Sequence, residues 1–181
     1  AGEVKVYSWN GSAWSQLGST LYGPSTEAGA AVGTSVDIND AGDKIVFGAY
    51  AYDGGSTNKG IAWVYSWNGS AWVIQDNSNS DLIGGSSRGS YGSRVSFDSD
   101  GDRVAVSGYG GSNSPGIVGM YEWDGSSWNI MGSTLTGSTS YDFLGYGISL
   151  DADGDQVAVG IRGEDGSAGD GSGAVSIYSW G

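Results

Sequence analysis

The side chains of this chain that could carry out acid–base chemistry are carboxylates, because the sequence contains no histidine and no cysteine. Ser-His-Asp and Cys-His catalysis are therefore excluded, as are the usual ligand sets of zinc, haem and copper. Neighbouring carboxylates such as Asp151 and Asp153, or Glu164 and Asp165, are the kind that glycosidases use. They lie in glycine-rich turns, so a solvated acidic surface is the better interpretation, and we predict no enzyme.

Composition points to many short strands joined by tight turns. The 181 residues include 35 Gly but 2 Pro, together with 8 Trp and 11 Tyr that would supply much of a core. The net charge of −13, with 7 basic residues, argues against nucleic acid as a partner. No apolar run approaches the roughly 20 residues of a membrane span, and no signal peptide is visible. Disulfides are excluded.

One eight-residue motif recurs along the whole chain. YSWNGSAW occupies residues 7–14 and again 65–72, YEWDGSSW follows at 121–128, and YSWG stands at 178–181. Its first Trp recurs at spacings of 58, 56 and 57 residues. A period near 57 residues with about three copies indicates a repeat architecture.

Each period contains four strand-like runs and no helical periodicity. In one period these runs are 93–98, 103–109, 117–123 and 126–132, each bounded by Gly, Asp, Asn or Ser. A four-stranded antiparallel sheet has two faces to bury, and radial packing against neighbouring sheets buries both. The sequence therefore predicts an all-β fold, a β-propeller-type array of four-stranded antiparallel blades.

The motif itself predicts a hairpin. Asn-Gly or Asp-Gly between two strands is a strong hairpin signal, and we expect both turn residues to take positive φ. Tyr7 and Trp9 then share a face and pack across the hairpin on Trp14. We interpret these aromatic side chains as packing between blades, with a sugar-stacking platform as the alternative.

At this level the sequence resembles a known family. YGSRVSFDSDGDRVAVSGY (91–109) followed by GIVGMYEW, and LGYGISLDADGDQVAVGIR (144–162) followed by GAVSIYSW, are similar to FG-GAP repeats, the blades of integrin-α-type β-propellers. The FG position is filled by Val32-Gly33, Tyr91-Gly92 and Leu144-Gly145. The GAP position is filled by Gly48-Ala49-Tyr50, Ser107-Gly108-Tyr109 and Gly160-Ile161-Arg162. The resemblance covers nearly the whole chain and implies a fold more than a function.

The resemblance also implies a loop for calcium between the first two strands of a blade. Two of the three loops offer carboxylates at alternate positions, as a hard cation prefers; the predicted ligands are Asp98, Asp100, Asp102, Asp151, Asp153 and Asp155. The loops depart from the family pattern, because Arg103 and Gln156 replace a Gly and Val106 and Val159 replace an acidic residue. A plain turn built from Asp and Gly is the alternative. No other cofactor is expected.

The family's strand order divides the 181 residues, taken as a single repeat domain, into four pieces. Residues 3–19 form a half blade, 28–83 and 88–137 form blades, and 143–181 form a partial blade without its fourth strand, giving thirteen strands in all. The two end pieces overlap in the YxW strand. We therefore expect either part of a longer array or self-association through open blade edges, as a ring of about six blades or as a fibre of copies stacked end to end.

Two motifs match N-glycosylation sequons, Asn10-Gly11-Ser12 and Asn68-Gly69-Ser70. The same letters serve the turn, so both interpretations stand.

Together these features predict a non-catalytic, extracellular or cell-surface module for adhesion or structural assembly through protein contacts. The alternative is a lectin-like propeller that binds carbohydrate with Trp or Tyr between blades. A propeller enzyme ranks third.

Overall fold

Four antiparallel sheets make up the computed structural model of the chain, which describes residues 2–23, 28–53, 59–75, 82–83, 89–111, 113–165, 169 and 171–181. No helix occurs in these described segments. The all-β prediction is therefore confirmed.

The strands follow the repeat. The first sheet is the hairpin of β1 (Tyr7–Trp9) and β2 (Trp14–Gln16). The second contains β3 (Val36–Ile38), β4 (Lys44–Ala49), β5 (Ile61–Trp67), β6 (Trp72–Ile74) and β7 (Leu82–Ile83). The third contains β8 (Arg94–Phe97), β9 (Arg103–Gly108), β10 (Ile117–Trp123), β11 (Trp128–Ile130) and β12 (Leu135–Thr136). The fourth contains β13 (Leu144–Leu150), β14 (Gln156–Ile161) and β15 (Ala174–Ser179).

Within a sheet, neighbours in sequence are neighbours in space, with orders β3-β4-β5-β6, β8-β9-β10-β11 and β13-β14-β15. The expected single fourth strand is instead two short strands, because β6 and β7 both pair with β5, and β11 and β12 both pair with β10. In the third sheet the segment between them contains Gly132 at φ 66°, a left-handed conformation that interrupts a strand. The predicted strand count was therefore too low.

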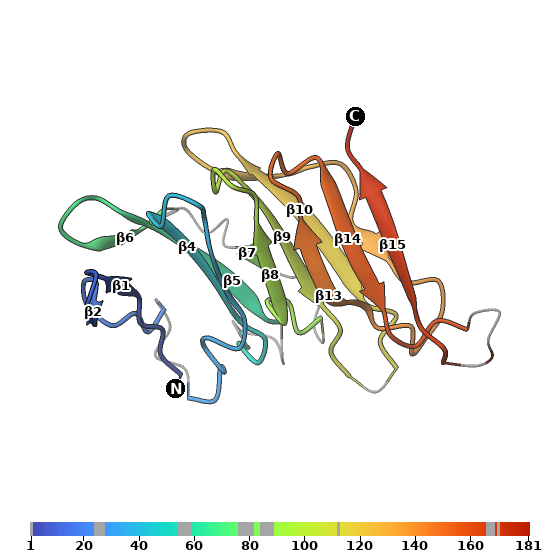
Figure 1. Cartoon of the computed structure of the whole chain (residues 1–181). Helices are drawn as coiled ribbons and strands as arrows, with labels where there is room; N and C mark the ends of the chain where they lie inside the picture. Colours follow the sequence, from blue (N-terminus) through green and yellow to red (C-terminus); the bar gives the residue numbers. More distant parts are fainter. Residues whose placement is uncertain are drawn as a thin grey trace.

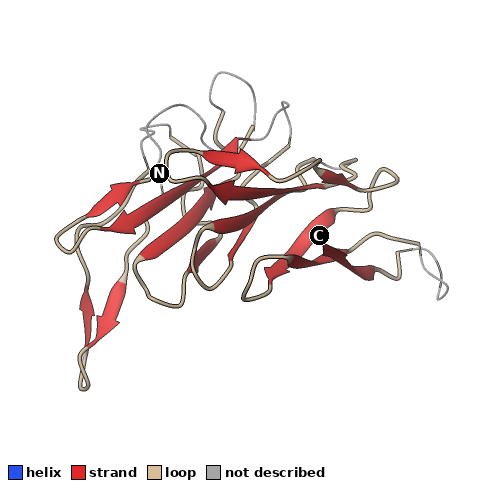
Figure 2. Cartoon of the chain, turned by 90° about the horizontal axis from the view of Figure 1, so that it is seen from above, coloured by secondary structure: helices blue, strands red, loops and turns tan. Residues whose placement is uncertain are grey.

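The sheets stand side by side in sequence order, and we call each sheet a blade for brevity (Figures 1 and 2). Three apolar clusters fill the spaces between successive sheets, around Trp63, Tyr91 and Val118 in turn. Figure 1 places the first hairpin and the last sheet at opposite ends of this row. Each of the two middle sheets thus packs against two neighbours, and each sheet at an end of the row packs against one.

Side chains of one inner strand also bind the backbone of the next. The amide of Val95 donates to Ser35 Oγ at 3.0 Å, and the amide of Phe97 donates to Asp37 Oδ2 at 2.7 Å. One blade further, the amide of Leu150 donates to Ser96 Oγ at 3.1 Å. β8 and β13 are edge strands, and these bonds satisfy amides on their open sides. The bonds also set the spacing between neighbouring blades.

The FG position has the same geometry in all three copies. Gly33, Gly92 and Gly145 have φ of 84°, 82° and 88°, and the residue before each is at most 6 % exposed. At Gly92 a Cβ atom would fall inside contact distance of the Ile61 carbonyl oxygen on the preceding sheet. Glycine is needed there both for the left-handed φ and for the close approach of two backbones.

The repeated hairpin forms as predicted, but its turn differs. Trp9 pairs with Trp14 in register, with ring centroids 5.5 Å apart. Gly11 alone of the Asn-Gly pair has positive φ, 97°. Asn10 instead uses its side chain, whose Oδ1 accepts the amides of Ser12 and Ala13 at 2.9 Å. The expectation of two positive φ values was wrong, because the asparagine side chain replaces a backbone acceptor in the turn.

Candidate functional site: acidic loops and open apolar faces

The predicted calcium ligands lie in the turns between β8 and β9 and between β13 and β14. The first carboxylate of each turn accepts hydrogen bonds from backbone amides of the same turn. Asp98 Oδ1 accepts the amides of Asp102 and Arg103, both at 3.1 Å, and Asp151 Oδ1 accepts the amide of Gln156 at 3.0 Å. Asn39 does the same in the first copy, accepting the amide of Lys44 at 2.9 Å. This common pattern is a hairpin turn closed by an Asx side chain.

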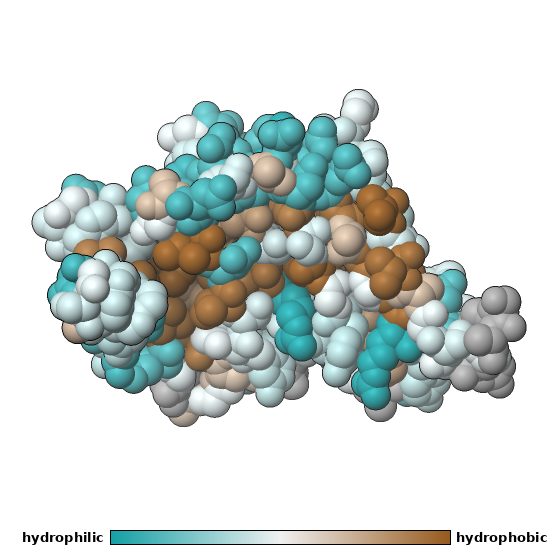
Figure 3. Space-filling model, in the orientation of Figure 1, coloured by the Kyte–Doolittle hydropathy of each residue, from teal (hydrophilic) through white to brown (hydrophobic). Residues whose placement is uncertain are grey.

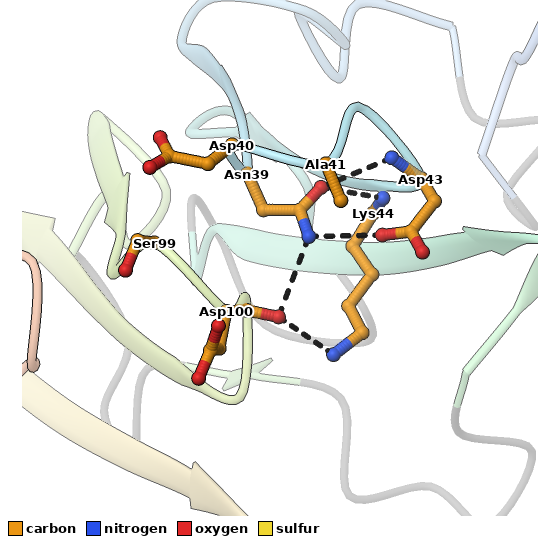
Figure 4. Close-up of a pocket in the computed structure, with 7 residues that line it drawn as sticks. All are labelled: Asn39, Asp40, Ala41, Asp43, Lys44, Ser99 and Asp100. Atoms are coloured by element: carbon orange, nitrogen blue, oxygen red, sulfur yellow. Dashed lines mark hydrogen bonds between the residues drawn. The ribbon is translucent and has the colours of Figure 1, made fainter.

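Successive turns also contact one another across the blades. Lys44 Nζ donates to the Asp100 carbonyl oxygen at 2.8 Å, and Asn39 Nδ2 approaches the same oxygen at 3.3 Å (Figure 4). Arg103 repeats the contact by donating to the Asp153 carbonyl oxygen at 3.0 Å. An open hollow of about 600 Å³ lies beside the first of these contacts, lined by Asn39, Asp40, Ala41, Asp43, Lys44, Ser99 and Asp100. The turns therefore help to hold neighbouring blades together.

Within the described part of the chain, no three carboxylates converge on a point that would hold a metal ion. Burial raises the pKa of Asp98 to about 6, and the neighbouring Asp102 adds to this rise. The pKa of Asp155 is also raised, first by desolvation and then by Asp151. Calcium binding at these loops stays a prediction.

Asp98→Asn is expected to stabilise the protein above pH 6. A carboxyl whose folded pKa lies near 6 and whose unfolded pKa lies near 4 makes the free energy of unfolding fall as pH rises between those values. Asparagine keeps the acceptor oxygen, as Asn39 shows, and removes the charge. The gain at pH 7 is about 1 kcal/mol after solvent screening. Urea unfolding from pH 4 to 8 measures it.

Asp100→Asn, an exposed change in the same loop, is the matched control and should keep the pH slope of the wild type. A wild-type slope that persists in Asp98→Asn would contradict the assignment. Calcium that raises the melting temperature of the wild type but not of Asp98→Asn would instead support a cation at this loop.

The two sequons lie on exposed turns. Asn10 and Asn68 are exposed, and each Oδ1 accepts a hydrogen bond from the serine hydroxyl two residues on, at 2.9 Å. The turn therefore uses both the asparagine and the serine of each sequon, and glycosylation stays a prediction.

The first open face lies on the last sheet. Aligning the third strands as GIAWVYSW, GIVGMYEW and GAVSIYSW makes Ala62, Val118 and Val175 equivalent. Ala62 and Val118 are fully buried against the next blade, whereas Val175 is 73 % exposed. Ile177 is 69 % exposed, although its equivalent Val64 is buried. These two residues, with Ala158 of β14 beside them, form what we call the C-terminal face.

The second open face lies on β3. Val36 and Ile38 are 53 % and 45 % exposed, but their equivalents Val95 and Phe97 in β8 are buried in the cluster between two blades. We call this pair the β3 face. Figure 3 shows hydrophobic surface (brown) exposed as a band across the molecule that reaches the last sheet.

The tryptophans of the second hairpin strand also differ in burial between the repeats. Trp72 and Trp128 are buried, at 8 % and 6 %, whereas their equivalent Trp14 is 66 % exposed. The prediction that aromatic side chains pack between the repeats is correct for Trp72 and Trp128, whereas Trp180 of the last sheet is 52 % exposed. In the described structure no other sheet packs on Trp14.

Comparison with known proteins places the chain in no family. No family model and no curated protein matches it. In addition, the described residues include no helix long and apolar enough to cross a membrane. The candidate site therefore rests on the geometry.

Sequence reasoning missed the four residues Val36, Ile38, Val175 and Ile177 as surface features. A signal was available, because each aligns with a residue of a middle repeat that must be buried between blades, and each belongs to an outermost repeat.

Proposed function

We propose that this chain is a non-catalytic, extracellular or cell-surface module of the β-propeller type that acts in adhesion or structural assembly through protein contacts. The observation that carries the proposal is the C-terminal face, where Val175 and Ile177 are exposed although their equivalents Ala62, Val118 and Val64 are buried and Met120 is partly buried. An exposed apolar patch on a highly acidic protein is typical of a protein interaction site.

Resemblance to FG-GAP repeats belongs to the same proposal. The three equivalent glycines with φ between 82° and 88°, each preceded by a buried side chain, support it. So do the antiparallel sheets packed in sequence order.

A non-catalytic role is supported by the inventory of side chains. The sequence contains no His and no Cys, and the carboxylates of Asp151 and Asp153 lie in a turn between strands, not in an enclosed cleft. Paired acid and base groups of a glycosidase need two carboxyls held across a substrate cleft.

The double variant Val175→Lys/Ile177→Lys tests the proposal. Both side chains are exposed, so the variant should fold as the wild type does. We expect sedimentation velocity over a concentration series to show association of the wild type that the lysines abolish, because desolvating two ammonium groups opposes burial of this face. Val73→Lys, an exposed valine on β6, is the matched control and should associate normally. Association that survives both lysines would contradict the proposal.

A lectin-like function is the second candidate, and one hollow favours it. Tyr141, Phe143 and Arg162 line an open hollow of about 370 Å³ together with Asp165. Tyr141 and Phe143 have positive φ, 77° and 52°, which is a strained conformation for aromatic residues. Aromatic faces beside charged groups suit a sugar ring. Selective binding on a glycan array, lost in Tyr141→Ala, would replace the first proposal by this one.

A further inference from the structure

Within the described segments, β15 pairs with β14 on one side, whereas the equivalent strands β5 and β10 pair on both sides, and a hollow lies beside this open edge of β15. The hollow has a volume of about 200 Å³ and lies between β15 and the preceding sheet. Its lining residues are Met120, Met131, Ser133, Leu135, Asp155, Val157, Tyr178, Ser179 and Trp180.

Other repeats show what fills such a hollow. Trp72, on the strand paired with β5, packs on Gly18 of the preceding hairpin and donates its indole Nε1–H to the Leu17 carbonyl oxygen at 3.0 Å. Trp128 occupies the corresponding place one blade on, without such a bond among the described residues. The segments Leu17-Gly18-Ser19-Thr20-Leu21 and Met131-Gly132-Ser133-Thr134-Leu135 are equivalent. The hollow at Met131 is thus shaped for one tryptophan on one added strand.

The chain itself exposes the matching tryptophan. Trp14 of β2 is 66 % exposed and is equivalent to Trp72 and Trp128. Its strand pairs with β1, within the segment GEVKVYSW (2–9), and β15 lies within GAVSIYSW (173–180). The two segments share Gly, Val and the final Tyr-Ser-Trp at the same positions. Either segment can therefore pair with β2.

We propose that β15 of one copy replaces residues 2–9 of a second copy by strand exchange, so that β2 of the second copy pairs with β15 and its Trp14 enters the hollow at Met131. This inference rests on the proposed function and names its partner, a second copy of the chain. Strand addition at an open edge and exchange of identical elements are established routes to association.

The exchange covers the C-terminal face, the β3 face and Trp14. Val175 and Ile177 take the places of Val4 and Val6, which are buried at 6 % and 7 % against the β3–β7 sheet. Val95, the equivalent of Val36, packs in one cluster with Ala62 and Val64, the equivalents of Val175 and Ile177. The C-terminal face of one copy would therefore meet the β3 face of the other. Each copy then contributes two whole blades and one shared blade at each junction, and two copies close a ring of about six blades, within the range of known propellers.

Two exposed tryptophans give a matched test. Trp14→Ala should weaken association about 30-fold or more, as loss of a central indole does at other interfaces. Trp9→Ala should leave association unchanged or strengthen it, because Trp9 lies on the displaced segment. The two side chains are 66 % and 53 % exposed, so both variants should fold, which circular dichroism checks. Equal effects of the two variants on sedimentation would overturn the exchange.

Engineered cysteines test the register, because the chain has no cysteine of its own. Ser15 pairs with Ser8 within one copy, and Ser179 is the equivalent of Ser8 in β15. Cross-strand partners lie about 4.5–5.5 Å apart at Cα, within the range of disulfides. Ser15→Cys/Ser179→Cys should therefore form covalent dimers on oxidation. Ser8→Cys/Ser15→Cys should lock β1 on β2 and leave monomers.

The combined outcomes separate the two proposals. Association that the lysines at 175 and 177 abolish, but that Trp14→Ala and the locked hairpin leave intact, overturns the exchange and keeps the proposed function. A wild-type chain that stays monomeric at every concentration contradicts self-association and overturns the exchange. Association lost in Trp14→Ala and in the locked hairpin, and kept in Trp9→Ala, supports both.

Discussion

Gly92→Ala should destabilise the protein by about 3–5 kcal/mol. The residue has φ 82°, which costs a side chain about 1–2 kcal/mol. In addition, its Cβ atom would collide with the Ile61 carbonyl oxygen, and Ala49 of the same sheet lies close by. Both contacts are backbone atoms of strands at a blade interface, so the neighbouring blade must move, as in an overpacked core. Urea unfolding followed by tryptophan fluorescence measures the loss.

Gly69→Ala separates the two contributions. Gly69 has φ 95° in the exposed hairpin turn, and a Cβ atom there would meet nothing within 4 Å. The variant should lose about 1–2 kcal/mol, from the backbone conformation alone. Equal losses at the two positions would show that the approach of two backbones at Gly92 costs nothing, and the glycine of the FG position would then be explained by φ alone.

The repeat, the strands and the repeated hairpin could be predicted from the sequence because each has a local signature. Tyr and Trp alternate in YSW, an Asn or Asp and a Gly mark the turn, and both recur at a constant period. The split of the fourth strand had no such signature. In the third sheet it depends on a left-handed glycine, Gly132, within a run that otherwise reads as one strand.

Exposure of the aromatic residues could not be predicted locally. YSWNGSAW is identical at 7–14 and 65–72, yet Trp14 is 66 % exposed and Trp72 is 8 % exposed. What differs is the neighbour, since Trp72 packs on the hairpin before it and no sheet packs on Trp14 in the described structure. A single residue type in one local sequence thus has two environments, and the position of the repeat within the array decides between them.

The acidic loops show a similar limit. Carboxylates at alternate positions predicted cation ligands, but the first of them, Asp98 and Asp151, accept amide hydrogens of their own turns. Asn39, which has no charge, makes the same bonds. Hairpin turns and calcium sites both favour Asp and Asn, so the spacing of these residues alone does not distinguish a turn from a cation site.

Trp72→Ala should cost about 3–5 kcal/mol, the range for deletion of a buried aromatic side chain. The indole is 8 % exposed, packs at a tilt on Trp67 with ring centroids 5.4 Å apart, and donates Nε1–H to the Leu17 carbonyl oxygen. Its loss leaves that carbonyl without the bond and opens a space between the first hairpin and the second sheet. Thermal unfolding should show the hairpin separating early, because Trp72 is a large part of what holds it to the β3–β7 sheet.

Trp14→Ala in the monomer is the control with the same local sequence. Its indole contacts Trp9 and is otherwise largely in solvent, so the loss of stability should stay below about 1 kcal/mol. The two substitutions delete the same side chain from the same octapeptide, and the difference between them measures what a preceding blade contributes to an indole. A Trp14→Ala cost as large as that of Trp72→Ala, in a dilute sample that is monomeric, would show that Trp14 is already packed within its own copy. A cost that grows with protein concentration is the result expected if a second copy supplies the missing neighbour, since association then stabilises the wild type by mass action.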